Sequence, residues 1–332
     1  MASLGVNAAR TRQLLLPLGI SAAGIGWVLY QIEPSAIADA FAQWNIAGVA
    51  LALAGLGLGY GARICRWRLM LLRLAVAPPL GQTAAIYLGS IALNNVLPLR
   101  AGDVARVAWL ARSRNIGITR GAVSVVLERA LDAAALGAIL LLAWPVGTPP
   151  PEFTLAVLLI ACLAALVAPW WFPVARRIGT ATIKWMPLPA VQSSWERFAG
   201  LLEEALAAFR KPGLAMLLVT LTGLVWCGEA LIFAGALISL GLAWPVAHVL
   251  LLTAAATLST LVPSGPSYVG TFHAAVIWCG RALGLEPTTA AALAIIAHLM
   301  VWLPTSLAGF ASLPWLRPTR TDMQVGRSAS RS

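Results

Sequence analysis

The sequence predicts an all-α membrane protein that crosses the bilayer several times. Hydrophobic residues make up 60% of the chain and charged residues only 11%, whereas soluble domains carry about 25% charge. Several apolar runs reach the roughly 20 residues that an α-helix needs to cross a bilayer. A membrane β-barrel would show alternating segments of about ten residues instead. The spans are therefore expected to be helices, which satisfy their own backbone hydrogen bonds in lipid.

We expect about six full spans and two broken, re-entrant helices within a single transmembrane domain covering 1–332. The expected full spans are 14–32, 46–62, 121–144, 153–172, 213–240 and 287–313. The first broken element runs from 82 to 97 and ends at Asn94, Asn95 and Pro98. The second covers 246–262 and resumes after the turn from Pro263 to Gly270. The alternative is eight plain spans, with both Pro-Gly stretches as tight loops.

The basic residues support the re-entrant arrangement. All but two of the 23 Lys and Arg residues, Arg129 and Arg281, fall in segments that it places on the cytoplasmic side, as the positive-inside tendency requires. Both termini are then cytoplasmic, 173–212 is a cytoplasmic interfacial segment, and 318–332 is a disordered basic tail. Because the bases are spread over every inside loop, the net charge of +11 does not indicate a nucleic-acid partner.

Corresponding segments of the two halves recur at a near-constant distance. Ile46 and Gly213 are 167 residues apart, and Gly121 and Pro287 are 166 apart. Each half, 13–145 and 153–313, would hold three crossings and one broken helix. An odd number of crossings inverts the second half relative to the first. Inverted repeats with paired broken helices are typical of transporters, which bind substrate where the broken helices meet.

The candidate binding site is made of polar residues within apolar segments, where each ionised side chain costs roughly 2.5–3.5 kcal/mol unless it has a partner. Arg100, Asp103 and Arg106 follow Pro98 and Gly102 at a spacing that suits an anionic head group; the alternative is an amphipathic helix touching anionic lipid. The remaining candidates are Asn94, Asn95, Glu128, Arg129, Asp132, Arg63, Arg66, Glu229, Pro263, Ser264, Gly270 and His273.

Two acids four residues apart, Glu128 and Asp132, share a helix face, and Arg129, three residues before Asp132, can pair with it. The excess negative charge could hold a proton or pair with Arg63, Arg66 or Arg68 of the neighbouring helix. A structural ion-pair lock is the competing interpretation. Glu229 could carry a proton or cap a partner. His273 and His298 are weaker candidates, because a lone His in an apolar run is usually a packed core residue.

No cofactor, metal site or catalytic constellation is expected. The four cysteines (Cys65, Cys162, Cys227 and Cys279) show no metal-binding spacing, and the sequence has no HExxH, Walker or GxSxG motif. The sequence therefore favours a protein that is not an enzyme.

Three motifs resemble those of the lysylphosphatidylglycerol synthase transmembrane-region family of flippase-like proteins, which includes hopanoid-cluster members. They are Asn95-x-x-Pro98-x-x-x-Gly102-Asp103-x-x-Arg106, Glu128-Arg129-x-x-Asp132 and the turn from Pro263 to Gly270. The resemblance implies a bacterial inner-membrane protein that moves or presents a lipid. One departure is His273, where the family often has Glu. Another is the short stretch after the last span, 314–332, from which we expect no aminoacyl-transfer domain.

Three functions follow as hypotheses. The first is a translocase for an anionic lipid or a polyprenyl- or hopanoid-type intermediate, whose partner is the head group of a membrane lipid. The second is a membrane-embedded transferase acting on a lipid carrier, with Asp103, Glu128 or Asp132 as base. The third is an accessory subunit that recruits a lipid-synthesis enzyme through 173–212.

Overall fold

The computed structural model describes residues 45–114, 116–143, 172–185, 188–260 and 264–316. These residues form helices joined by turns, with no strand among them, which confirms the predicted all-α class. The expected span at 14–32, nearly all of the span at 153–172, and the tail from 318 lie outside the described residues.

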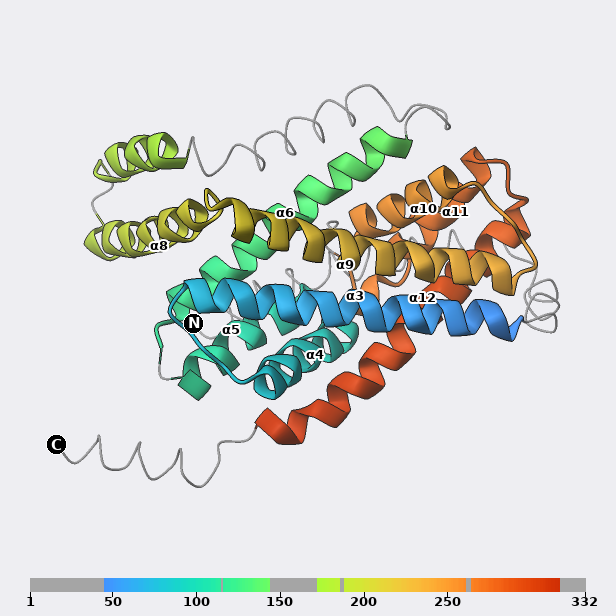
Figure 1. The fold of residues 1–332 in the computed structure, drawn as a ribbon, viewed down its shortest axis with the longest axis horizontal. Coiled ribbons are helices and arrows are strands. Elements are labelled where there is room, and N and C mark those ends of the chain that lie inside the picture. Colours follow the sequence, from blue (N-terminus) through green and yellow to red (C-terminus); the bar gives the residue numbers. More distant parts are fainter. Residues whose placement is uncertain (1–44, 115, 144–171, 186–187, 261–263, 317–332) are drawn as a thin grey trace, which may run out of the picture.

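The helices follow the predicted elements closely (Figure 1). The first half contains α3 (Ile46–Arg73), α4 (Leu80–Val96), α5 (Ala101–Arg114) and α6 (Ile118–Ala143). A helix at 172–183 and α8 (Pro189–Ala208) follow. The second half contains α9 (Pro212–Ser239), α10 (Val246–Ser259), the 3₁₀ turn η2 (Pro266–Tyr268), α11 (Thr271–Ala282), α12 (Pro287–Ser312) and η3 (Leu313–Leu316). Pro opens α8, α9 and α12, where its missing N–H costs no helical hydrogen bond.

Three of the described helices are long and apolar enough to cross a membrane: Ile46–Arg73, Pro212–Ser239 and Pro287–Leu316. Helix α3 runs eleven residues past the predicted end of its span, so the basic residues after Ala62 lie on the helix itself. Helix α6 has 26 residues, but Glu128, Arg129 and Asp132 stand in its middle. The count of six full spans therefore remains a prediction.

Helices α3 and α9 pack side by side across the centre of the molecule (Figure 1). Gly48 of α3 faces Gly235 of α9, and Gly55 faces Gly228. Because the contacts run in opposite chain directions, the two helices are antiparallel. A Cβ atom on Gly228 would stand 2.5 Å from the carbonyl oxygen of Gly55, so only glycine permits this close approach, as in other small-residue interfaces of membrane helices.

The other helix contacts occur in pairs. Helix α4 packs against α12, and its counterpart α10 packs against α6. Helix α5 likewise packs against α4 and α6, while α11 packs against α10 and α12. Exchanging the two halves converts each contact into its partner, and this is the pattern that a twofold repeat would produce.

The turn between α4 and α5 and the turn between α10 and α11 have the same unusual backbone conformation. Both contain two consecutive left-handed residues that are not glycine: Leu99 (φ 60) with Arg100 (φ 53), and Ser267 (φ 58) with Tyr268 (φ 57). Such residues cost on the order of 1–3 kcal/mol each and persist where surrounding contacts enforce them. The turns contact each other, since Arg100 lies 5.6 Å from the ring centroid of Tyr268 and donates a 2.7 Å hydrogen bond to the Thr260 carbonyl.

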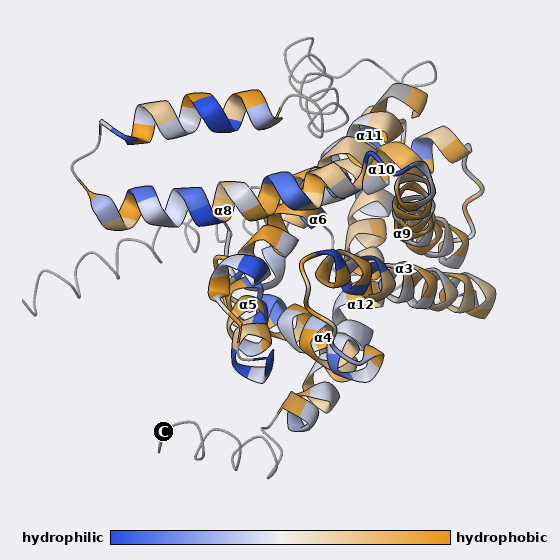
Figure 2. Ribbon diagram, turned by 60° about the vertical axis from the view of Figure 1, so that its left-hand side comes forward, coloured by the Kyte–Doolittle hydropathy of each residue, from blue (hydrophilic) through white to orange (hydrophobic). Residues whose placement is uncertain are grey.

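The expected interfacial segment is a helical hairpin that projects from the bundle (Figure 2). The helix at 172–183 pairs with α8 through Arg176, which contacts Glu203 at 2.6 Å and Glu196 at 3.3 Å. Trp185, just after the first helix, is 89% exposed. The placement of this hairpin on the cytoplasmic surface of a membrane remains a prediction.

The α3–α9 interface yields a first prediction. Gly228→Leu forces a side chain into the Gly55 backbone and should lower the melting temperature and the folded yield, because overpacking of this kind costs about 1–3 kcal/mol or more. The measurement is fluorescence-detected size-exclusion chromatography after heating in detergent. Gly57→Leu is the matched control, since a Cβ there meets nothing within 4 Å. Equal melting temperatures for the two variants would contradict the glycine interface.

Candidate functional site

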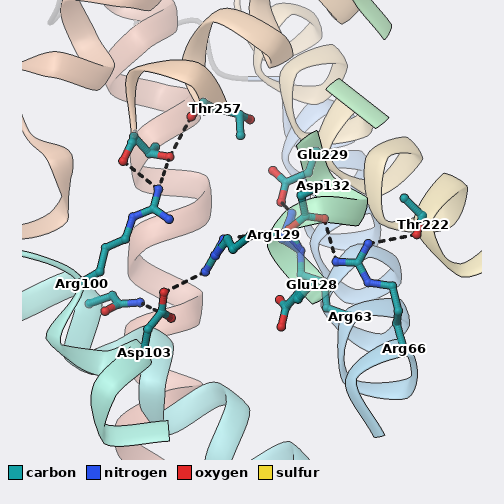
Figure 3. Close-up of polar contacts among 12 residues, drawn as sticks. Arg63, Arg66, Arg100, Asp103, Glu128, Arg129, Asp132, Thr222, Glu229 and Thr257 are labelled. Atoms are coloured by element: carbon teal, nitrogen blue, oxygen red, sulfur yellow. Dashed lines mark hydrogen bonds and ion pairs between the residues drawn. The ribbon is translucent and has the colours of Figure 1, made fainter. Parts of the chain in front are cut away.

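Charged residues of α3, α5, α6 and α9 form a polar network in the interior of the bundle (Figure 3). At its inner end, Arg66 of α3 is fully buried. It donates hydrogen bonds to Asp132 Oδ1 at 2.7 Å and to Thr222 Oγ1 at 3.0 Å. Of the alternatives considered for the excess negative charge of α6, the structure shows Asp132 paired with Arg66 of the neighbouring helix. This contact joins α3, α6 and α9.

A second buried pair joins α5 to α6. Arg106 donates to Glu128 Oε2 at 2.9 Å, and the Tyr87 hydroxyl donates to Glu128 Oε1 at 2.6 Å. The guanidinium group lies 4.9 Å from the Tyr87 ring centroid and 5.0 Å from that of Trp67, within range for cation–π attraction. Arg106 is 1% exposed, so it locks the helices together, whereas the sequence analysis placed it against a head group.

The third pair is the accessible one. Arg129 contacts Asp103 at 2.9 Å and Asp132 at 4.0 Å, so its main partner lies on α5 and the predicted local pair with Asp132 is the longer contact. The side chain of Arg129 remains 41% exposed, compared with 15% for Asp103. Arg129 is thus the most exposed residue among the ion pairs of this network.

The Gly-Asp motif is explained by contacts with α4. The Gly102 amide donates to Asn94 Oδ1 at 2.8 Å, and Asn94 Nδ2 donates to Asp103 at 3.3 Å. A Cβ atom on Gly102 would stand 1.9 Å from the Ser90 carbonyl oxygen. The close neighbour of Gly102 is therefore α4, and its amide is bonded to Asn94 and not free to bind an anion.

Two further candidates connect the halves. Asn95 donates to Thr305 Oγ1 at 3.0 Å and to Ser306 Oγ at 2.9 Å, both on α12. Arg63 of α3 pairs with Glu229 of α9 at 2.6 Å, across 166 residues of sequence. This separation equals the repeat distance found in the sequence. Of the two roles considered for Glu229, the structure shows it pairing with a base.

Arg100 is the exception to charge pairing. It donates to the carbonyl and the hydroxyl of Thr260 at 2.7 and 3.0 Å, and no carboxylate of the described residues lies within ion-pair distance of it. The network as described holds five arginines (Arg63, Arg66, Arg100, Arg106 and Arg129) and four acids (Asp103, Glu128, Asp132 and Glu229). The site thus carries a surplus positive charge, where the sequence analysis of α6 suggested a negative one.

The second turn holds the remaining candidates. Gly270 precedes α11 with φ 96, a conformation that favours glycine. Ser264 is 2% exposed, and His273 stacks on His298 with ring centroids 4.8 Å apart. Pro263 lies outside the described residues. Among those that are described, no group of three or more His, Cys, Asp or Glu residues could hold a metal ion.

Sequence reasoning missed Tyr87, Trp67, Thr222, Thr260 and Tyr268 as members of the site. Aromatic and hydroxyl residues in apolar runs usually only pack against their neighbours, so the residue type alone did not indicate a functional site. The position of Tyr268 relative to proline was the available signal, because Tyr268 follows Pro266 by two residues in the second turn, as Arg100 follows Pro98 in the first.

The buried pairs give a second prediction. Glu128→Ala leaves Arg106 buried without its partner and should cost about 3–5 kcal/mol, seen as a lower melting temperature and less folded protein in detergent. The triple variant Tyr87→Phe, Arg106→Met, Glu128→Leu removes all three polar partners and should recover most of that loss. An unchanged melting temperature for Glu128→Ala would contradict the role of the Arg106–Glu128 pair in holding α5 and α6 together.

The three motifs of this network can now be compared with known proteins. No curated protein matches the chain. A family model described as the lysylphosphatidylglycerol synthase TM region matches residues 14–309, a range that contains both broken turns and every charged residue of the network. The family connects the chain to lipid metabolism or translocation. This multi-pass membrane protein therefore belongs to the lysylphosphatidylglycerol synthase TM region family.

Proposed function

We propose that this protein is a translocase that moves an anionic lipid, a phospholipid or a polyprenyl- or hopanoid-type intermediate, between the leaflets of a bacterial inner membrane. The observation that carries the proposal is Arg100, a cation on a strained turn that contacts the other half without a carboxylate partner among the described residues. An intramembrane charge of this kind marks a substrate pathway by default.

Arg129 supplies a second contact for the head group. It bonds to Asp103, three residues after Arg100, and Figure 3 shows its guanidinium group pointing toward the segment that carries both residues. Two guanidinium groups can hold phosphate oxygens through paired N–H donors. Asp103 fixes Arg129 in position, while the buried pairs behind it keep the helices in register. The head group would thus bind where the surplus charge lies.

Movement would follow from the inverted repeat. The two broken turns meet through Arg100, Thr260 and Tyr268, and the antiparallel α3–α9 contact is the orientation that inverted halves need. In transporters built this way, one half rocks against the other around a fixed site. The Arg100 contacts would break and reform as the turns separate.

The transferase hypothesis has less support. Asp103, Glu128 and Asp132 each accept a hydrogen bond from an arginine, so none is free to approach a reacting group. A recruiting role for the hairpin is the second candidate function. It is favoured by the projection of the hairpin and the exposed Trp185, and a lipid-synthesis enzyme would be its partner.

Transport in liposomes tests the proposal. Arg100→Gln and Arg129→Gln remove charge-assisted hydrogen bonds to the head group, each worth about 1.5–3 kcal/mol, and should slow leaflet exchange by tenfold or more. The measurement is dithionite quenching of fluorescent anionic phospholipid in reconstituted vesicles. Arg112→Gln is the control, because Arg112 is exposed at the end of α5. Unchanged rates in both Arg100 and Arg129 variants would refute the site, and no transport by folded wild-type protein would refute the function.

Cysteine labelling tests the inverted topology. In a background without the native cysteines, Arg112→Cys should react with an impermeant maleimide only from the cytoplasmic side. Glu286→Cys, between α11 and α12, should react only from the opposite side, because Arg112 lies in the last turn of α5 and Glu286 follows α11, the counterpart of α5 in the inverted half. Labelling of both from one side would show that the halves are not inverted.

A further inference from the structure

The first helix of the projecting hairpin, at 172–183, carries an exposed apolar stripe (Figure 2). Val174, Ile178 and, just after the helix, Trp185 follow one another at intervals of four and seven residues, a spacing that places side chains on one helix face. They are 57%, 63% and 89% exposed, and Ala181 between them is exposed as well. Large apolar side chains gathered on one exposed face mark a surface that contacts a partner.

Another face of the same helix is occupied by α8. Arg176 pairs with two glutamates of α8. A Cβ atom on Gly179 would stand 2.5 Å from the ring of Trp195, whose indole N–H donates a hydrogen bond to Thr180. The hairpin is therefore held together by one side of its first helix, and the apolar stripe lies outside that contact.

Two basic residues flank the stripe. Arg177 and Lys184 are exposed, and neither has an ion-pair partner among the described residues. Both line the same hollow as Trp185, so their charges stand beside the largest apolar side chain of the stripe. Exposed apolar residues with a tryptophan and unpaired bases are typical of a helix that lies in the head-group region of an anionic membrane.

Both ends of the hairpin continue into apolar segments. Its first helix follows the apolar run at 153–171, part of an expected span, and α8 leads into α9, which is long and apolar enough to cross a membrane. The base of the hairpin is therefore expected at the membrane surface. From Val174 to Trp185 the stripe extends about 16 Å at the helical rise per residue, so the whole stripe can meet the membrane only if the helix lies along its surface.

We propose that the outer face of the hairpin docks on the anionic surface of the membrane, with the apolar stripe among the head groups and the two flanking bases on lipid phosphates. A protein partner fits this face less well, because lysine is depleted in protein interfaces, whereas bases beside an apolar stripe complement an anionic leaflet. Docking would hide the side chains that a recruited enzyme would need. The inference is independent of lipid transport, since it concerns an anchor and requires no translocated substrate.

A fluorescent label on the stripe tests the docking in lipid nanodiscs that hold the full chain. Ala181→Cys, in a background without the native cysteines, carries the dye, and phosphatidylcholine with a spin label near its head group is the quencher. The dye should be quenched more strongly when the nanodisc contains phosphatidylglycerol. Arg177→Gln and Lys184→Gln should each lower the ratio of quenched to unquenched dye about fivefold. Ser193→Cys, exposed on α8, is the matched control position and should not be quenched.

The outcomes separate a membrane from a protein partner. Loss of quenching at position 181 when Ile178→Ser and Trp185→Ser are introduced together would support docking through the stripe. Quenching at position 181 no stronger than at position 193 would overturn the proposal and leave the exposed face to a protein partner. Quenching that is unchanged when both bases are removed would overturn the assignment to an anionic surface. Because all the substituted side chains are exposed, each variant should elute as folded protein in size-exclusion chromatography.

Discussion

The structure depends on the requirement that charge taken out of water be paired. Helix α6 carries Glu128, Arg129 and Asp132 in its middle, and taking such groups out of water costs several kcal/mol each unless a partner compensates. Arg66 and Arg106 supply that compensation from α3 and α5. The positions of α3, α5 and α6 are thus coupled, since moving one helix would separate at least one buried pair.

Pairing also explains why only part of the charged set is available for a ligand. Arg66 and Arg106 are buried and bonded to acids, whereas Arg129 is partly exposed and Arg100 contacts only Thr260 and an aromatic ring among the described residues. The inner pairs therefore set the geometry, and in the proposed site the outer arginines would supply the attraction. A structural lock and a binding site were alternatives for the same motif, and under this proposal they would correspond to different residues within it.

The sequence predicted the helices and their order well, because apolar length and the placement of Pro and Gly are local signals. It also grouped the charged residues into one candidate site, but it did not predict which residues pair with one another. Arg106 and Glu128 meet only because α5 crosses α6, and Gly102 lies against Ser90 because α4 folds back on α5. Spacing along a helix could not reveal those crossings. Arg63 and Glu229 were predictable in principle, since their separation equals the repeat distance.

The two halves share a backbone plan but differ in chemistry, and that difference suits transport better than identity would. Both turns hold consecutive left-handed residues, yet the first is surrounded by arginines and the second by hydroxyls and imidazoles. A pathway charged on both sides would hold an anion tightly and release it slowly, because each charge-assisted hydrogen bond is worth more than a neutral one. In the proposed translocase, a head group held by Arg100 and Arg129 would face a neutral second wall, which would let it leave as the turns move apart.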